Sequence, residues 1–376
     1  MNDCTFSPAR CHIDLGAIAR NFARLGPAAT LMPVIKSDAY GHGLLPVARA
    51  LTEAGARQFA VGIVDEGVAL REAGLAQRVV TLLGAQSDAD WEAARAHGII
   101  PAVGDFEQLE RAAAHSGTGA ALRIAVQCET GMGRLGFTEE DLPRLMDRLR
   151  GMPGVEPALA VSHFACADMP EQEGYTAAQQ RRFAAMTDAL RAAFPSMQRS
   201  LANTAGLLGR RGTNCEAARP GLAIYGGNPF GAAGPDDAPA LEWAMSVCAP
   251  VLSVRRLAAG QSVSYGRTFT APRPLTVAVV GIGYATGFAR ALSNRAAMLV
   301  NGRRAPQVGR VCMGLTMLDV TDAGPVRPGD PAWALGGPAA AGERPVTPQE
   351  LADLLGTIPY EVLCLMGGMN PRVYHN

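Results

Sequence analysis

The sequence is nearly devoid of lysine. It holds 34 lysine and arginine residues, and because only Lys36 is a lysine, the other 33 are arginines. Arginine can replace lysine as a solvated charge, but its guanidinium stays protonated and does not act as a nucleophile. A lysine amine can be deprotonated and attached to a carbonyl as a Schiff base. The scarcity makes Lys36 a candidate for covalent chemistry, with a stray surface lysine in an arginine-rich chain as the alternative.

Net charge and long apolar runs are missing as well. The 34 basic and 34 acidic residues cancel, which argues against nucleic acid or an anionic membrane surface as the main partner. No apolar run approaches the roughly 20 residues of a membrane span. The first residues lack the basic and apolar segments of a signal peptide, so we expect a cytoplasmic protein with no membrane partner.

The eight cysteines follow no metal-binding spacing. They are scattered along the chain, without a Cys-x-x-Cys arrangement and without a histidine at ligand spacing. We therefore predict no metal site and interpret the cysteines as reduced thiols of a cytoplasmic protein.

The surroundings of Lys36 are typical of an active site in a parallel α/β fold. An apolar run at 31–35 predicts a buried strand that ends directly before Lys36. The next segment, 37–43, contains capping residues and two glycines and predicts a turn. Parallel α/β folds keep their chemistry at the carboxyl ends of their strands, which is the expected place of this lysine.

Short apolar strands alternate with helical stretches through the first 225 residues. The expected strands are 11–15, 31–35, 59–64, 79–83, 99–103, 122–126, 158–162, 200–202 and 222–225. A capping signature begins at Ser87, and 175–194 has the apolar spacing of a long helix. About eight strand–helix units in about 230 residues predict an α/β fold with an N-terminal (β/α)8 TIM-type barrel; a doubly wound sheet is the alternative.

The pattern changes after the barrel. Residues 226–240 are rich in Gly, Pro, Ala and Asp and predict a linker. Strand-like runs follow at 245–257, 275–281, 297–300, 310–313, 316–320 and 332–335, with one helix at 348–355. We expect a barrel domain of residues 1–240 and a mostly β C-terminal domain of residues 241–376, which about the first ten residues could join.

Eight segments resemble, in order, the signatures of one enzyme family. They are VIKSDAYGHG at 34–43, TGMGRLG at 130–136, SH at 162–163, ANT at 202–204, RPG at 219–221, SYG at 264–266, GY at 283–284 and VCM at 311–313. Together they resemble the alanine racemases. The resemblance implies a pyridoxal-phosphate (PLP) enzyme with a barrel and a C-terminal β domain, acting as a homodimer with shared active sites on a small amino acid.

The resemblance also implies two acid/base residues. Lys36 would carry the PLP and serve one face of the substrate, while Tyr265 of the other subunit would serve the opposite face. Racemisation needs such a pair because one proton leaves Cα and another arrives from the other side. A tyrosine with a pKa near 10 needs cationic neighbours to lower it, and we expect His163 and Arg219 to act so.

The remaining implied roles concern binding. Arg219 would face the pyridine nitrogen, His163 and Asn203 would lie at the cofactor, and the phosphate would be bound by Tyr40, Thr204, Gly221 and Leu222. The substrate-binding residues would be Arg134, Met313 and Tyr284.

Pattern alone leaves plainer interpretations open for these residues. Arg219 could be a surface arginine, His163 a core histidine, Tyr265 a half-buried strand tyrosine and Met313 a core methionine. Asn203 and Thr204 could simply cap a helix.

Four positions depart from the family pattern. Gln127 stands where relatives often carry a carbamylated lysine, and Gly314, Thr286 and Gly368 replace larger or acidic residues at the expected substrate entrance. Gln127 could also merely end a strand. These departures make a broader alanine/serine racemase the nearest alternative function. A barrel-type PLP amino-acid decarboxylase and a non-catalytic PLP carrier are more distant ones.

Overall fold

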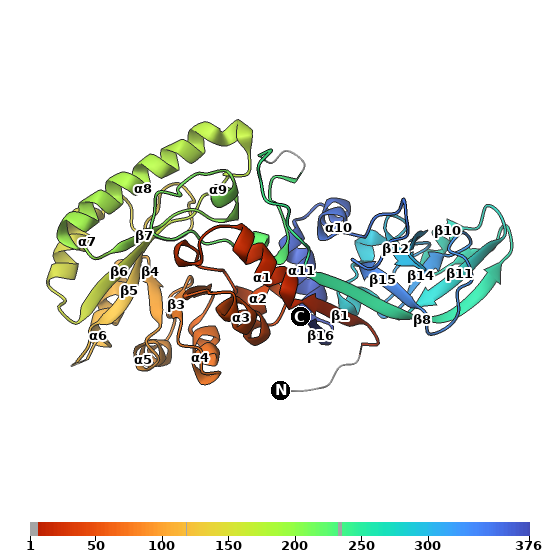
Figure 1. The fold of residues 1–376 in the computed structure, drawn as a ribbon, viewed down its shortest axis with the longest axis horizontal. Coiled ribbons are helices and arrows are strands. Elements are labelled where there is room, and N and C mark those ends of the chain that lie inside the picture. The colour runs from red at the N-terminus through yellow and green to blue at the C-terminus, as the bar shows by residue number, and fades with distance from the viewer. Residues whose placement is uncertain (1–6, 118, 232–234) are drawn as a thin grey trace. The chain divides into compact units, whose positions relative to one another are not determined.

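The computed structural model describes residues 7–117, 119–231 and 235–376. The described chain forms two compact units. Residues 18–39 and 44–242 form the barrel unit, whereas the residues up to 17, segment 40–43 and residues 243–376 form the β unit (Figure 1).

The barrel unit is built on a parallel sheet. Its six strands pair in the order in which they follow one another in the chain. They are β2 (Gln58–Val61), β3 (Arg78–Thr81), β4 (Ile100–Val103), β5 (Leu122–Gln127), β6 (Val155–Val161) and β7 (Gln198–Ser200). Strands β2 and β4 are buried along their whole length, which is why they appear in the sequence as continuous apolar runs.

Two further extended segments close this sheet into a barrel. Val34 bridges to Ala60 of β2, and Leu31 bridges to Ala218, both in parallel. Arg219 in turn donates its backbone N–H to the carbonyl of Ala202, just beyond β7. Segments 31–35 and 217–220 therefore add two strands to the six, and the (β/α)8 prediction is confirmed over the doubly wound alternative.

One expected strand is wrong. Residues 222–225 form a short 3-10 helix, Leu222–Tyr225, which ends at Gly226 with φ of 100°. The eighth barrel strand lies just before it, at 217–220. The position of this strand is set by its pairing with the 31–35 strand. It could not be predicted from the local sequence, because Arg219 and Pro220 give no strand-like pattern.

Helices lie along the outside of the barrel strands (Figure 1). They are α1 (Leu15–Arg24), α3 (Leu44–Glu53), α4 (Val64–Glu72), α5 (Asp88–Ala96), α6 (Phe106–Ala114), α7 (Leu142–Arg150), α8 (Glu173–Ala193) and α9 (Thr204–Leu208). Ser87 begins α5 with a capping box to Asp90, and α8 covers the predicted long helix.

The β unit contains a larger, mostly antiparallel sheet. Its strands are β1 (Arg10–Asp14), β8 (Met245–Leu257), β11 (Leu275–Val280), β12 (Ala297–Val300), β13 (Arg303–Pro306), β14 (Thr316–Asp319), β15 (Pro331–Leu335) and β16 (Arg372–His375). The main path runs β13-β12-β15-β8-β1-β16, and β11 joins β8 to β14. The expected strand at 11–15 therefore pairs in this unit and not in the barrel.

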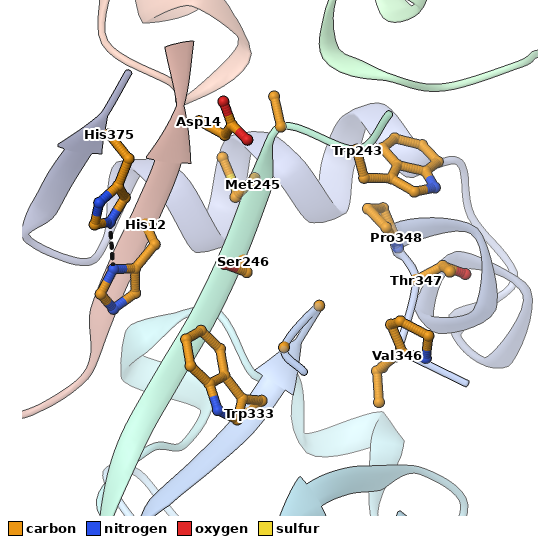
Figure 2. A pocket seen from close by; sticks show the side chains of 14 residues that line it. His12, Asp14, Trp243, Met245, Ser246, Trp333, Val346, Thr347, Pro348 and His375 are labelled. Carbon is orange, nitrogen blue, oxygen red and sulfur yellow. Dashed lines mark hydrogen bonds between the residues drawn. The ribbon is translucent and has the colours of Figure 1, made fainter. Parts of the chain in front are cut away.

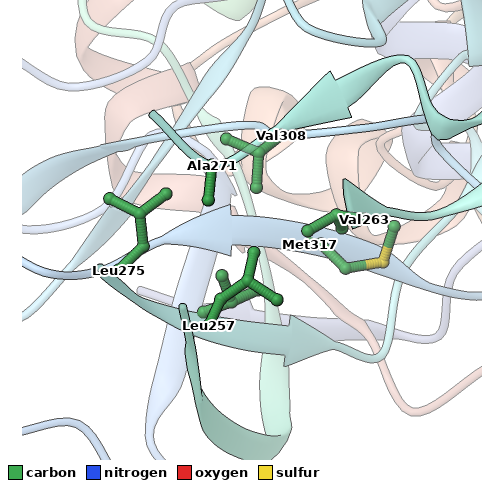
Figure 3. Close-up of a cluster of buried hydrophobic side chains, with 7 residues drawn as sticks. Leu257, Val263, Ala271, Leu275, Val308 and Met317 are labelled. Carbon is green, nitrogen blue, oxygen red and sulfur yellow. The ribbon is translucent and has the colours of Figure 1, made fainter. Parts of the chain in front are cut away.

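A compact apolar cluster holds the outer part of this sheet together. Figure 3 shows Leu257 at the end of β8, Leu275 on β11 and Met317 on β14 packed around Val263 and Val308. Val263 belongs to a short hairpin of β9 (Ser262–Val263) and β10 (Phe269–Thr270). The cluster fixes the base of the loop that follows β9, which carries Tyr265.

The C-terminal stretch holds more helix than expected. Besides α10 (Pro348–Leu355) there is α11 (Pro359–Gly368), and residues 310–313 are not a strand. Within the predicted linker, residues 232–234 lie outside the described residues, as do residues 1–6 at the start. In the described chain no single helix is long and apolar enough to cross a membrane; α10 and α11 reach that length only together, bent by 108°.

Candidate active site

Lys36 lies where the sequence predicts it. It follows the 31–35 strand, is half-buried, and begins the short element α2 (Lys36–Tyr40). This element is a left-handed turn, because Ser37, Asp38, Ala39 and Tyr40 all have φ of 54°. Left-handed helix costs L-residues roughly 1–2 kcal/mol each. A run of four without glycine therefore needs support from its surroundings.

Three cations surround His163. Burial, followed by the charges of Arg219, Arg134 and Lys36, lowers the pKa of His163 to about 3. The structure thus brings the lysine and two candidate arginines to one place in the barrel unit. Asn203 donates its Nδ2–H to Nε2 of His163 over 3.3 Å, which fits a neutral ring.

The neutral ring corrects one expectation. We expected His163 to act as a cationic neighbour, but at neutral pH it carries no charge. The lone pair on Nε2 is already engaged by Asn203. Of the two residues expected to lower a tyrosine pKa, only Arg219 is a cation.

Arg219 is a buried residue and not a surface one. Its side chain is part of the barrel interior, with 4% of the residue exposed. Nη1 donates to the carbonyl and the hydroxyl of Ser200, and Nη2 donates to the carbonyl of Ser162. Burial lowers its pKa to about 10, so the guanidinium remains charged at neutral pH.

The Nε–H of Arg219 has no acceptor among the described residues. Its other N–H groups are held by the carbonyls of two barrel strands and of Leu201. The Nε atom is also absent from the buried polar atoms that lack a hydrogen-bond partner, so this N–H remains accessible. A ligand with an acceptor atom, such as a pyridine nitrogen, would satisfy it.

Arg134 lies at the tip of a turn that Glu129 holds. The Glu129 carboxylate accepts backbone N–H bonds from Gly131, from Gly133 at 3.0 Å and from Arg134 at 3.2 Å. On the other side, Tyr175 of α8 donates its hydroxyl to the carbonyl of Gly131 at 2.5 Å. The Arg134 guanidinium itself makes no hydrogen bond or ion pair with any described residue. Its backbone is fixed while its charge remains available.

Gln127 ends β5, and no hydrogen bond joins it to Arg134. Its backbone carbonyl accepts from the N–H of Phe137, but its amide makes no hydrogen bond to described residues. No hydrogen bond therefore joins the Gln127 amide to Arg134 in the described chain.

Asn203 and Thr204 begin α9. Asn203 caps the helix, since its Oδ1 accepts from the N–H of Gly206 at 2.9 Å. The buried Thr204 hydroxyl accepts from the N–H of Gly221 at 2.9 Å. The capping interpretation is correct for Asn203, and the N–H of Gly221, an expected phosphate donor, already has a partner. The hydroxyl proton of Thr204 can still be donated.

The remaining candidates belong to the β unit. Tyr40 is buried, and its ring packs against Tyr360 with centroids 5.6 Å apart. Burial raises the pKa of Tyr40, so its hydroxyl stays protonated and can donate a hydrogen bond. Tyr265 and Met313 are 72% and 63% exposed, and Tyr284 is 41% exposed. The core interpretation of Met313 is wrong, as is the half-buried strand interpretation of Tyr265.

The departures from the family pattern leave open space. A Cβ added at Gly314 or at Gly368 would meet no atom within 4 Å. Thr286 is used locally, because its Oγ1 accepts from the N–H of Gly283 at 3.2 Å and donates to the carbonyl of the same residue.

A separate pocket contains none of the predicted site residues. Figure 2 shows this cavity of about 670 Å³ in the β unit, with Trp243 and Trp333 on its walls and the hydrogen-bonded pair His12 and His375 at one side. It holds neither the lysine nor an arginine. Among the described residues, no cluster of three or more His, Cys, Asp or Glu could hold a metal ion.

Sequence reasoning missed the two glutamates that hold the candidate turns. Glu129 directly precedes the TGMGRLG segment, and Glu66 lies in the first turn of α4. An acidic residue directly before a glycine-rich turn is a usable signal for the first. Glu66 has no such signal, because it is 30 residues away from Lys36 in the chain.

Comparison with known proteins agrees with this arrangement. Residues 13–229 match the family model "Alanine racemase, N-terminal domain", and residues 244–374 match "Alanine racemase, C-terminal domain". The alanine racemase of Nitratidesulfovibrio vulgaris (strain DSM 19637 / Miyazaki F) is 51% identical over 366 residues, covering 96% of each chain.

Solved structures agree as well. The alanine racemase of Bacillus anthracis with bound L-Ala-P is 30% identical with a TM-score of 0.89, covering 99% of this chain and 96% of that one. The alanine racemase of Bartonella henselae with covalently bound pyridoxal phosphate is 29% identical with a TM-score of 0.84, covering 98% and 99%.

Proposed function

This chain belongs to the alanine racemase family, and from that premise we propose how its own residues carry out the reaction. It is a PLP-dependent enzyme that interconverts L-alanine and D-alanine. When bound, PLP withdraws electrons from the substrate Cα and so makes the Cα proton removable.

The residues present fit this cofactor. Lys36 is the chain's one side-chain amine. Arg219 carries an Nε–H that no described residue accepts, which suits the pyridine nitrogen, and the permanent cation would keep that nitrogen unprotonated. The protonated Tyr40 hydroxyl, the Thr204 hydroxyl and the N–H of Leu222 would hold the phosphate.

Lys36 and Tyr265 would move the protons. One of them takes the proton from one face of Cα, and the other delivers a proton to the opposite face, so the configuration inverts. The reverse reaction exchanges their roles. Arg134 would bind the substrate carboxylate through its unpaired guanidinium. His163, being neutral, would position Asn203 and the cofactor without adding charge.

We propose that a second copy of the chain completes each site. Tyr265, Met313 and Tyr284 are all large, exposed side chains of the β unit. Exposed residues of this kind are typical of an interface, and the C-terminal domain from about residue 241 would bring them to the partner's barrel. The enzyme would act as a cytoplasmic homodimer, with no nucleic acid or membrane partner.

A broader substrate range is the second candidate. A Cβ at Gly314 or Gly368 would meet no atom within 4 Å, and such open space at the expected substrate entrance would suit a side chain larger than a methyl group. Serine would be the first such substrate. A chiral product assay across the common amino acids decides between narrow and broad specificity. The same assay separates racemisation from decarboxylation, which releases carbon dioxide, and from cofactor storage, which gives no product.

The observation that best supports the proposed racemase site is that Lys36, Arg134 and Arg219 all lie near His163. Mixed dimers test it most sharply. Neither Lys36→Ala nor Tyr265→Phe alone should racemise alanine well. Unfolding and refolding the two variants together should make about half of the dimers mixed, each with one intact site.

The expected recovery is about one quarter of wild-type activity. Each variant refolded alone is the control and should recover nothing. If the mixture stays as inactive as its components although mixed dimers form, Tyr265 does not act across the interface.

A further inference from the structure

The turn after Lys36 is held by one carboxylate. Oε1 of Glu66 accepts the backbone N–H of Asp38 at 3.1 Å, and Oε2 accepts the backbone N–H of Gly62 at 2.7 Å. Asp38 lies in the middle of the left-handed turn, and Gly62 directly follows β2. Glu66 therefore joins the end of the lysine-bearing strand to the end of its neighbour in the barrel.

Asp38 continues the connection to the next helix. Its Oδ1 accepts the N–H of Leu44, the first residue of α3, at 2.7 Å. The turn is thus tied at its middle to α4 through Glu66 and to α3 through its own side chain. These ties oppose the return of the turn to right-handed backbone angles.

A side chain at position 62 would crowd both Lys36 and Glu66. A Cβ at Gly62 would lie 3.4 Å from the Cβ of Lys36 and 3.2 Å from Oε2 of Glu66. The backbone of Lys36 therefore lies between two fixed segments. The 31–35 strand precedes it, and the turn held by Glu66 follows it.

We propose that Glu66 is a positioning residue that holds the left-handed turn and thereby aims Lys36 at the reacting Cα. The proposal rests on the proposed function of Lys36. Glu66 needs both carboxylate oxygens, because each accepts a different N–H. A glutamine offers one acceptor oxygen and turns an NH2 group toward the second N–H, so Glu66→Gln breaks one of the two ties.

Hydrogen exchange of the Asp38 amide tests the tie without any catalysis. In Glu66→Gln, this amide should exchange faster by on the order of tenfold, with or without PLP, because a hydrogen bond to a charged group is lost. Asp65→Asn is the matched control. It removes the same charge from the same turn of α4, and Asp65 is exposed and has no hydrogen bond to described residues.

Two further readouts report on Lys36 itself. As the chain's one lysine, it can be followed by its rate of modification with an amine reagent in the cofactor-free protein. The visible circular dichroism of bound PLP reports how the cofactor is held. Both should change in Glu66→Gln, and kcat should fall by on the order of 10²-fold while KM for alanine changes little.

A glycine in the turn provides a rescue. Ser37 is exposed and has φ of 54°, so Ser37→Gly relieves the backbone without emptying the core. Added to Glu66→Gln, it should restore part of the lost kcat and of the circular dichroism. It also supplies a testable protein if Glu66→Gln alone does not fold.

Unchanged exchange, circular dichroism and kcat in Glu66→Gln, as in Asp65→Asn, would overturn the proposal. So would slowed catalysis that Ser37→Gly does not relieve, since that outcome places the effect elsewhere than the turn. The proposed function fails separately, if Lys36→Ala still binds PLP covalently.

Discussion

Apart from the buried Tyr40 of the β unit and the exposed Arg134 of the barrel unit, the two units of this chain differ in how they present their candidate residues. In the barrel unit, Arg219 and Thr204 are 4% and 3% exposed, and barrel strands or turns hold their polar groups. In the β unit, Tyr265 and Met313 are 72% and 63% exposed, and no hydrogen bond holds the Tyr265 hydroxyl to a described residue.

In the proposed site, Arg219 and Thr204 would bind the cofactor, whereas Tyr265 and Met313 would reach the substrate. Buried groups in a rigid barrel can hold a cofactor in one orientation, because packing leaves them no other rotamer. Exposed tyrosine and methionine side chains cost free energy until something covers them. We infer that the barrel unit supplies most of the groups that bind PLP, whereas catalysis needs the β unit of a second copy.

Removing the lysine should have the largest effect. Lys36→Ala should abolish both racemisation and covalent PLP binding, because no other side-chain amine exists in the chain. Absorbance of the dialysed protein and borohydride reduction followed by peptide mapping check this. PLP retained covalently on any other peptide contradicts the assignment of Lys36.

Changing the exposed tyrosine should separate the two units. Tyr265→Phe should lower kcat by about 10²–10⁴-fold, the contribution of a positioned acid/base group. PLP absorbance and affinity should be unchanged, since the barrel holds the cofactor. Deuterium exchange at Cα from one enantiomer should outlast racemisation. Wild-type turnover of both enantiomers would remove Tyr265 from the mechanism.

Loosening the Arg134 turn should have a smaller effect within the barrel. Glu129→Gln should raise KM for alanine by about tenfold, because it removes an acceptor for one of the backbone N–H groups that fix the turn. PLP binding and kcat should change little. Glu139→Gln is a suitable control, since Glu139 is exposed and makes no side-chain hydrogen bond to described residues. An equal KM in both variants means that Glu129 does not position Arg134.

The same carboxylate gives a pH dependence with a defined sign. Burial opposes ionisation of Glu129, but the N–H bonds from Gly133, Gly131 and Arg134 outweigh it and lower its pKa below the usual 4.5. Its contribution to the free energy of unfolding is therefore fully present above pH about 4.5. It is lost as the pH falls through the lowered pKa. Urea unfolding of wild type and Glu129→Gln from pH 7 to 3 should show the two curves converge.

Bicarbonate should have no effect on activity. Gln127 cannot be carbamylated, and its amide is neutral, so no charge arises at this position. Assays after removal of carbon dioxide, and again after adding bicarbonate, should agree. Gln127→Ala should also leave kcat and KM close to wild type, which a catalytic role for Gln127 would not allow.

Strand and helix prediction succeeded where local pattern and tertiary environment agree. In strand β5 and helix α8 the spacing of apolar residues in the sequence agrees with the positions that are buried. The predicted bounds of both were therefore close to correct. Residues 222–225 failed because an apolar run of four fits a buried strand and a buried 3-10 turn equally well. Helix α11 was missed because it has apolar residues on several faces and therefore shows little helical periodicity.

The sequence by itself determined the chemistry that is available. One lysine, a conspicuous set of glycine-rich turns and the absence of a metal-binding pattern are properties of composition and order, and they need no coordinates. Only the tertiary structure decided which groups meet. Glu66 and Asp38, or Arg219 and Ser162, are far apart in the chain, and the closed barrel makes them neighbours. The protonation state of His163 also depends on the tertiary structure, because burial close to three cations leaves its ring neutral.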